Sequence, residues 1–197
     1  MPTVESQQTR FIHDFAGSHR HVLDYLLEEV LEGQPKDVRD FMMQTSLLYR
    51  FNADLCNTIT FRNDSPKLLD YLDTNNLFLV PLDDVRQWYR YHHLFADLLR
   101  SQLEGEEPDA GREIQISAAR WHEAQGDHEQ AIDYALAAGS YDFAAEMIQA
   151  RLAHTMWQTA LSTWQRWHRQ IPQDLLVQYP LLAYTCLLYT SPSPRDA

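Results

Sequence analysis

The adjacent histidines His92 and His93 are the residues of this chain whose type and position best suit binding chemistry. They follow an aromatic segment, 88–91, and stand where a helical pattern begins. An imidazole N–H beside the start of a helix can donate to an anion, which the positive end of the helix also attracts. Arg90, two residues earlier, could add a positive charge. The alternatives are a pair that caps the helix or packs against a hairpin, and an exposed arginine.

Other reactive side chains do not form a recognisable site. The nine histidines include three pairs that are close in sequence. His19 and His21 have the spacing of a strand inside an expected helix, and His92 and His93 are expected to point to different faces. His122 and His128 have no carboxylate or cysteine at a spacing that suits metal ligands. No serine, cysteine or lysine stands in a nucleophile motif, and Cys56 lies in an apolar stretch that suits a core thiol. We therefore expect neither a metal site nor an enzyme.

The composition excludes several classes of protein. The 197 residues include 16 Lys and Arg against 28 Asp and Glu, a net charge of −12, which disfavours nucleic-acid binding. The six glycines form no phosphate-binding loop, so a complete nucleotide hydrolase is not expected. No apolar run approaches the roughly 18 residues of a membrane span, and the start does not read as a signal peptide. With only two cysteines, the chain suits the cytoplasm.

The hydrophobic pattern of the first half predicts a winged helix. Helical spacing of apolar residues predicts helices over 19–32, 37–48, 53–59, 67–72 and 92–103. Asp64 is expected to cap the fourth of these helices, with Pro66 just inside it. Short apolar runs at 77–80 and 88–91 predict a β-hairpin with a long loop, in which Asp83 and Asp84 suit a turn.

The second half is predicted to be helical throughout, over 112–125, 128–138, 141–155, 156–170 and 173–184. Turns at Gly126 and Gly139 are each followed by small residues, as in tetratricopeptide-type superhelices, although a generic helical hairpin would also suit. Trp157, Trp164 and Trp167 could form a ligand-binding stripe on a helix, but packing between stacked helices is the commoner reason for such a stripe.

Several segments resemble one known family in register from about residue 15 to about residue 182. They are FAGSHRHVLDYL at 15–26, VRDF at 38–41, NLFLVPLD at 76–83, WYRYHHLFADLLR at 88–100 and ARWHEAQG at 119–126. They are similar to the large MalT-like, ATP-dependent LuxR-type transcriptional regulators, which are signal-transducing ATPases. The resemblance implies an order of nucleotide-binding domain, helical piece, winged helix, tetratricopeptide-like superhelix and DNA-binding helix-turn-helix. This chain would be an internal fragment that carries the middle of that order.

The resemblance also implies a domain division and a site. The expected parts are the end of an ATPase-associated region at 1–35, a winged helix at 36–104, a linker at 105–111, helical repeats at 112–185 and a non-native tail at 186–197. That tail looks like translated sequencing adapter, although a native linker rich in proline and serine has a similar composition. His92 aligns with a histidine that touches the phosphates of bound ADP in related ATPases, and His93 stands where those ATPases have an acidic residue.

The resulting hypothesis is a regulatory middle segment. The winged helix would couple the nucleotide state of an absent ATPase domain, which binds ATP or ADP, to a small-molecule or protein effector sensed by the superhelix. The alternative is a free-standing helical scaffold that binds proteins and has no nucleotide role. A DNA-binding repressor is less well supported, since 36–104 holds eight Lys and Arg against ten Asp and Glu, and the expected recognition helix carries Asp70 and Asp73.

Overall fold

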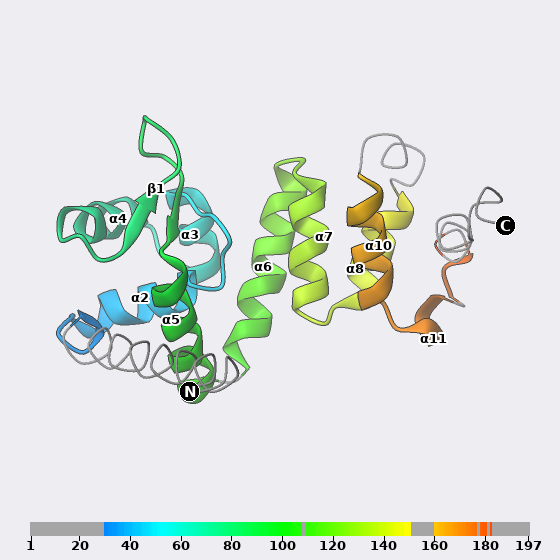
Figure 1. The fold of residues 1–197 in the computed structure, drawn as a ribbon, viewed down its shortest axis with the longest axis horizontal. Coiled ribbons are helices and arrows are strands. Elements are labelled where there is room, and N and C mark those ends of the chain that lie inside the picture. The colour runs from blue at the N-terminus through cyan, green and yellow to red at the C-terminus, as the bar shows by residue number, and fades with distance from the viewer. Residues whose placement is uncertain (1–29, 108, 151–159, 177, 181, 183–197) are drawn as a thin grey trace, which may run out of the picture. The chain divides into compact units, whose positions relative to one another are not determined.

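The computed structural model describes residues 30–107, 109–150, 160–176, 178–180 and 182. The chain divides into two compact units, one that runs to Ala110 and one that starts at Gly111. The first contains the two strands, and in the described part of the second the elements are all helices (Figure 1). The first of the predicted parts, 1–35, falls mostly outside the described residues, and the predicted tail at 186–197 falls wholly outside them.

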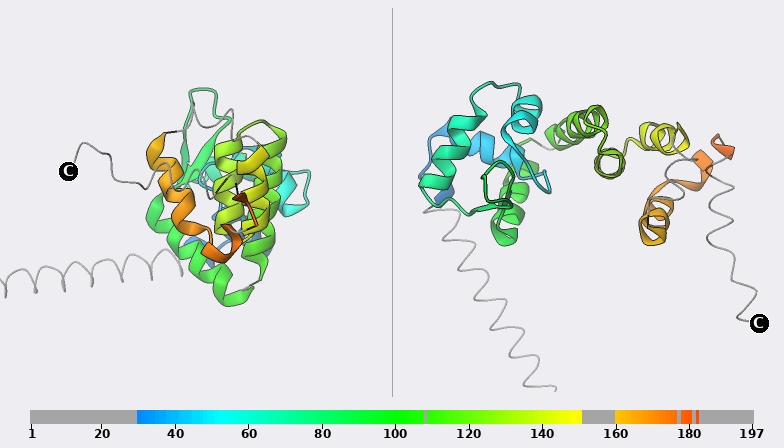
Figure 2. Two further views of the ribbon diagram at one scale, coloured as in Figure 1. Left: turned by 90° about the vertical axis from the view of Figure 1, so that its right-hand side faces the viewer. Right: turned by 90° about the horizontal axis from the view of Figure 1, so that it is seen from above.

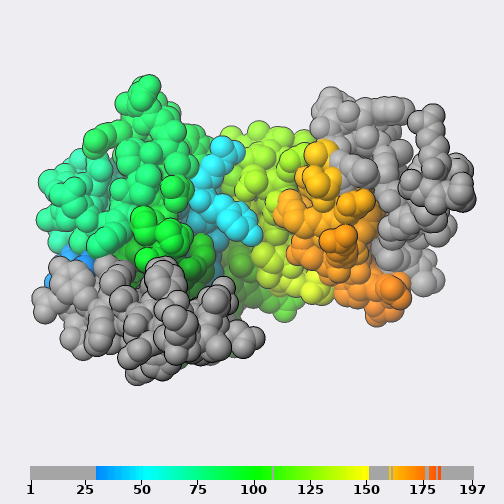
Figure 3. Space-filling model, viewed as in Figure 1, coloured from blue at the N-terminus to red at the C-terminus, as the bar shows by residue number. Residues whose placement is uncertain are grey.

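The first unit is a winged helix, as predicted. Its elements are α2 (Lys36–Thr45), α3 (Ala53–Thr60), α4 (Ser65–Thr74), β1 (Leu79–Pro81), β2 (Tyr89–Tyr91) and α5 (His93–Glu106). The strands pair antiparallel with Val80 opposite Arg90, and the loop that joins them forms the wing. Figure 2 shows the paired strands, and Figure 3 shows the wing projecting from this unit at the top of the view.

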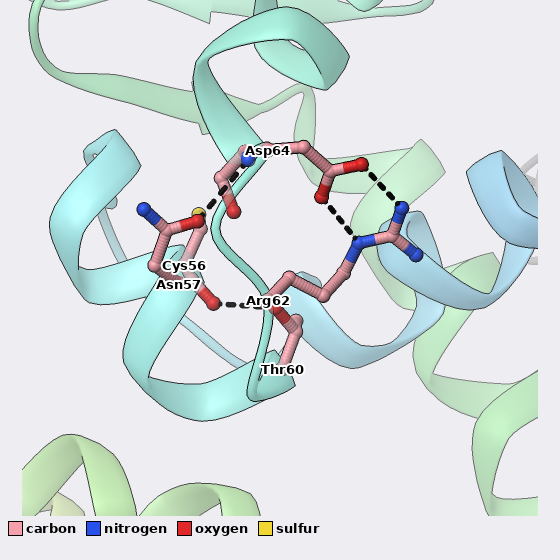
Figure 4. Close-up of polar contacts among 6 residues, drawn as sticks. Cys56, Asn57, Thr60, Arg62 and Asp64 are labelled. Atoms are coloured by element: carbon pink, nitrogen blue, oxygen red, sulfur yellow. Dashed lines mark hydrogen bonds and ion pairs between the residues drawn. The ribbon is translucent and has the colours of Figure 1, made fainter.

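The start of α4 is held differently from the prediction. Asp64 occupies the capping position, but its side chain makes no capping hydrogen bond. Instead its carboxylate accepts two hydrogen bonds from the Arg62 guanidinium, at 2.8 and 2.9 Å. The side chain of Asn57 on α3 accepts from the Ser65 backbone N–H at 3.1 Å and so supplies the cap from a neighbouring helix (Figure 4). A cap from another element cannot be recognised by local spacing.

Helix α2 ends at Thr45, three residues before the predicted end at Leu48. The Thr45 hydroxyl donates to the Phe41 carbonyl at 2.7 Å, and the Ser46 hydroxyl donates to the Met43 carbonyl at 2.6 Å. Such side-chain bonds compete with the backbone ladder of a helix. The apolar period continues past this point, so periodicity alone extended the helix too far.

Both strands of the hairpin are shorter than predicted, and β1 begins two residues after the start of the predicted run at 77–80. Leu77 is buried before the strand begins, and Phe78 has a left-handed backbone with φ of 56°. A third segment also joins the sheet, since Phe51 and Tyr89 exchange two backbone hydrogen bonds of 2.8 Å. The pairing by Phe51 is an isolated bridge and shows no strand-like alternation, so the sequence analysis missed it.

The second unit consists of α6 (Ala110–Ala124), α7 (His128–Ala137), α8 (Tyr141–Ala150), α10 (Leu161–Gln170) and the short α11 (Gln173–Leu176). Gly126 and Gly139 take the left-handed turn conformation, with φ of 78° and 64°, between successive helices as predicted. Figure 1 shows that α6, α7 and α8 alternate in direction. Alanines of α7 and α8, such as Ala131 and Ala144, are fully buried, which allows the close approach of these helices.

Some predicted boundaries in and around this unit are wrong. Helix α5 continues through Gly105 to Glu106 and α6 begins at Ala110, so the non-helical connection is shorter than the predicted linker at 105–111. Helix α10 begins only at Leu161, because Ala160 is extended with ψ of 142°. The predicted helix over 173–184 is interrupted before Pro180, a residue type that disfavours helical backbone at the preceding position.

The tryptophans of α10 belong to the core. Trp164 and Trp167 are 1% and 0% exposed, and their rings meet edge to face at a centroid distance of 5.5 Å. The Trp167 indole N–H donates to Asp133 of α7 at 2.7 Å, and Arg166 also bonds that carboxylate. The packing interpretation of the stripe is therefore confirmed for these two residues, while Trp157 lies outside the described part of the chain.

Candidate functional site

The predicted histidine pair lies at the junction of β2 and α5. His92 is the residue just before α5, and its backbone N–H donates to the Phe78 carbonyl at 2.9 Å, which ties the start of the helix to the hairpin. The imidazole of His92 does not cap the helix. The rings of His92 and His93 lie side by side, tilted by 34° with centroids 4.4 Å apart, so the expectation that they point to different faces is wrong.

The charges around this junction favour an anion. The first turn of α5 contains no acidic residue, and His93 is exposed at the first helical position. Arg90 is exposed on β2, opposite Val80. Free backbone N–H groups at a helix start, two imidazoles and a guanidinium are donors that phosphate oxygens accept well. These residues therefore fit one end of a diphosphate, while a pocket for a whole nucleotide is not formed by them alone.

Aromatic packing fixes the position of the junction. Phe95 in the first turn of α5 is fully buried, and its ring lies 5.1 Å from that of Phe78 and 6.0 Å from that of Tyr91. The Tyr91 hydroxyl is 2.9 Å from the Thr45 hydroxyl, and burial raises the pKa of this tyrosine. The histidine pair thus rests on a rigid base made by α2, the hairpin and α5.

A separate cleft lies elsewhere in the winged helix. It has a volume of about 470 Å³ and is formed by the start of α3, by α4 and by the wing. Its lining residues are Asn52, Ala53, Asp54, Pro66, Leu69, Asp70, Arg86, Gln87 and Tyr89. Local sequence patterns single out Pro66 as a helix-start residue and Asp70 as an acidic residue of the expected recognition helix, but they do not indicate a cleft. Three separate segments supply the lining, and the fact that they meet has no signature in local spacing.

The wing beside this cleft is an ordered turn. The Asp83 carboxylate accepts from the backbone N–H groups of Gln87 and Trp88 at 2.8 and 3.1 Å, which confirms its predicted turn role. Arg86 has a left-handed backbone with φ of 52°, and its guanidinium bonds the carboxylate of Asp73 on α4. These contacts hold the wing against α4 and keep the cleft open between them.

Two further groups belong to the framework. Cys56 is fully buried, and burial raises the pKa of its thiol far above the usual value, as expected for a core cysteine. The Arg62 guanidinium lowers the pKa of the Asp64 carboxyl. Within the described residues, no group of three or more histidine, cysteine, aspartate or glutamate side chains could hold a metal ion. In that same part of the chain, no helix is long and apolar enough to span a bilayer.

The fold defines a winged-helix module, with a wing and a helix that starts at two adjacent histidines, joined in sequence to a helical array. Residues 27–111 match the family model of the MalT winged helix domain, and this part of the chain belongs to that family. The chain is MalT-like over most of its length.

Similar curated proteins include several HTH-type transcriptional regulators named MalT. The one from Vibrio campbellii is 30% identical over 167 residues, which cover 84% of this chain and 18% of the relative. The one from Vibrio cholerae is 35% identical over 132 residues, 66% of this chain and 14% of the relative. The one from Klebsiella pneumoniae is 35% identical over 144 residues, which cover 73% of this chain and 16% of the relative. The chain thus matches less than a fifth of the length of each of these relatives.

Proposed function

We propose that this chain is the regulatory middle segment of a MalT-like LuxR-family transcriptional regulator. In this proposal the winged helix couples the nucleotide state of an ATPase domain to an effector sensed by the helical array. The match of 27–111 to the MalT winged helix domain and the regulator names of the relatives support the regulatory role. In this proposal the chain itself is not an enzyme, and it acts in the cytoplasm.

The start of α5 carries the nucleotide part of the proposal. The rings of His92 and His93 lie 4.4 Å apart at a helix start that has no acidic residue in its first turn, with Arg90 two residues before His92. In the proposed closed state, His92 donates from its imidazole to a phosphate oxygen of ADP held by the ATPase domain, and the α5 backbone N–H groups favour the same charge. The adjacent ring of His93 supports that of His92, and Arg90 adds long-range attraction.

Regulation then follows from a shift between two arrangements. An effector that binds the helical array more tightly in the open arrangement weakens the winged-helix clamp, because a ligand shifts an equilibrium by its difference in affinity for the two states. By the same linkage, loss of the His92 contact should weaken ADP binding and lower the requirement for effector.

The test replaces His92 with alanine in the complete regulator. A hydrogen bond to a charged group is worth about 1.5–3 kcal/mol, so we expect ADP affinity to fall about tenfold or more. Transcription should also become less dependent on effector. His128→Gln is the matched control, since His128 is a partly exposed histidine of the helical array and bonds Glu123 at 3.1 Å.

Unchanged ADP affinity together with unchanged effector dependence in His92→Ala would remove the role given to this residue. If the complete protein also lacked any upstream nucleotide-binding motif, the chain would be better described as a helical scaffold that binds proteins. A salt-dependent affinity of the isolated chain for duplex DNA would instead support a DNA-binding winged helix, which this proposal does not expect.

A further inference from the structure

We propose that the cleft between α3, α4 and the wing binds an arginine or lysine side chain presented by an apolar segment of a partner protein. This inference involves neither the histidine pair nor a nucleotide, so it can succeed or fail independently of the function proposed above. It rests on the shape of the cleft, on the balance of charge inside it and on the exposed apolar side chains of the wing beside it.

The floor of the cleft suits the aliphatic part of a long basic side chain. Leu69 of α4 and Tyr89 of β2 are buried residues that face the cleft, and Pro66 and Ala53 complete its apolar lining. A volume of about 470 Å³ lies in the range of pockets that take one small molecule or one or two side chains. Lysine and arginine bury their methylene stems along such surfaces while the charged end stays near water.

The charge balance of the cleft favours a cation. Asp54 of α3 and Asp70 of α4 are exposed carboxylates that line it. The only cationic side chain in the lining is Arg86, and its guanidinium is already engaged by Asp73. The remaining carboxylates of Asp54 and Asp70 are thus available to a cationic ligand, whereas the phosphates of a nucleic acid would meet like charge.

The wing beside the cleft indicates a protein segment rather than a free small cation. Val85 and Leu82 are 70% and 45% exposed, and Val85 directly precedes the cleft residue Arg86. Asp83 holds this wing in one shape through its two backbone contacts, so the apolar side chains sit on an ordered support. A small cation would leave them in water, while an apolar segment on both sides of a basic residue would cover them.

The experiment measures the affinity of the full 197-residue chain for defined peptides by isothermal titration calorimetry. The probe is an end-capped pentapeptide with a central arginine between leucines, and its partner peptide carries neutral citrulline in place of arginine. Spermidine is the small-cation probe. We expect the arginine peptide to bind about tenfold more tightly than the citrulline peptide, with an affinity that falls as salt rises.

Substitutions then assign the binding to the cleft. Asp54→Asn with Asp70→Asn should weaken the arginine peptide about five- to tenfold and leave the citrulline peptide unchanged, since two exposed ion pairs are lost. Glu104→Gln with Asp109→Asn makes the same change of charge at exposed positions outside the cleft lining and the wing, and should have little effect. Val85→Ser should lower the affinity for both peptides and leave the affinity for spermidine unchanged.

Asp54 stands in the first turn of α3, where a carboxylate favours the helix, so circular dichroism must show that the double variant is folded. Asp70→Asn alone, in the interior of α4, tests the same idea without touching a helix end and should weaken the arginine peptide two- to fivefold. The proposal is overturned if no peptide binds at millimolar concentration, if citrulline and arginine peptides bind equally, or if spermidine matches the arginine peptide. It is also overturned if duplex DNA displaces the peptide.

Discussion

The described cores of the two units differ in how much alanine they contain. The winged helix completely buries large side chains, among them Phe41, Met42, Phe51, Leu55 and Phe95. The helical array also buries large side chains, such as Trp164, Trp167 and Tyr134, but beside them it completely buries alanines of α6, α7 and α8: Ala118, Ala119, Ala131, Ala135, Ala144 and Ala145. Buried alanines allow neighbouring helices to approach closely, whereas the winged helix fills its interior mainly with larger side chains.

The described polar contacts also differ in reach. In the winged helix several join distant segments, as when Arg100 donates to the Ser46 carbonyl at 2.9 Å or Thr45 meets Tyr91. In the array, the turn after α6 carries two local pairs, His122 with Asp127 and His128 with Glu123, each at 3.1 Å. Long-range polar contacts thus help to hold the site of the winged helix, whereas the turn after α6 is held by local ones and Asp133 adds a longer-range link to α10.

The largest effect is expected from removing a large side chain of the winged helix. Phe95→Ala should lower the free energy of unfolding of this unit by about 3–5 kcal/mol, because it leaves a cavity beneath Phe78 and Tyr91. Urea denaturation followed by hydrogen exchange of peptides from this unit measures the loss. Phe61→Ala is the control, since Phe61 is 89% exposed, and should change stability little. Equal losses for both variants would contradict the cavity argument.

A smaller loss of stability is expected in the array when a buried side chain is enlarged rather than shortened. Ala135 of α7 is fully buried, and Ala135→Leu should cost about 1–3 kcal/mol because the added atoms force helices apart. Ala137→Leu on the same helix adds the same atoms at an exposed position and should be close to neutral. The comparison of the two units would fail if Ala135→Leu were tolerated as well as Ala137→Leu when peptides of α7 and α8 are followed by hydrogen exchange.

Periodicity and turn residues predicted the order and type of nearly all described elements. The helices, the hairpin and the turns at Gly126 and Gly139 follow from local patterns. The ends of elements were less predictable, because they depend on side chains that the period ignores. Thr45 and Ser46 end α2 through their hydroxyls, and the cap of α4 comes from Asn57 of another helix.

The sites show the same limit. That His92 and His93 stand at a helix start could be predicted from the change of pattern after 88–91, but the close approach of their rings could not. The cleft was not predictable at all, since 52–54, 66–70 and 86–89 meet only when the wing folds against α4. Chemistry carried by one short segment can be read from the sequence, while chemistry shared by several segments needs the fold.

The smallest expected effect concerns the polar contacts that Asp133 of α7 makes with α10. Asp133→Asn keeps an acceptor for the Trp167 indole N–H but removes the charge that faces Arg166, at 2.8 Å. Arg166 is half exposed, so the loss should be about 0.5–1 kcal/mol and should shrink at high salt. Tryptophan fluorescence during urea denaturation measures it, with Asp174→Asn in the exposed part of α11 as the control. A loss above about 2 kcal/mol that ignores salt would show that the array, like the winged helix, depends on a buried long-range polar contact.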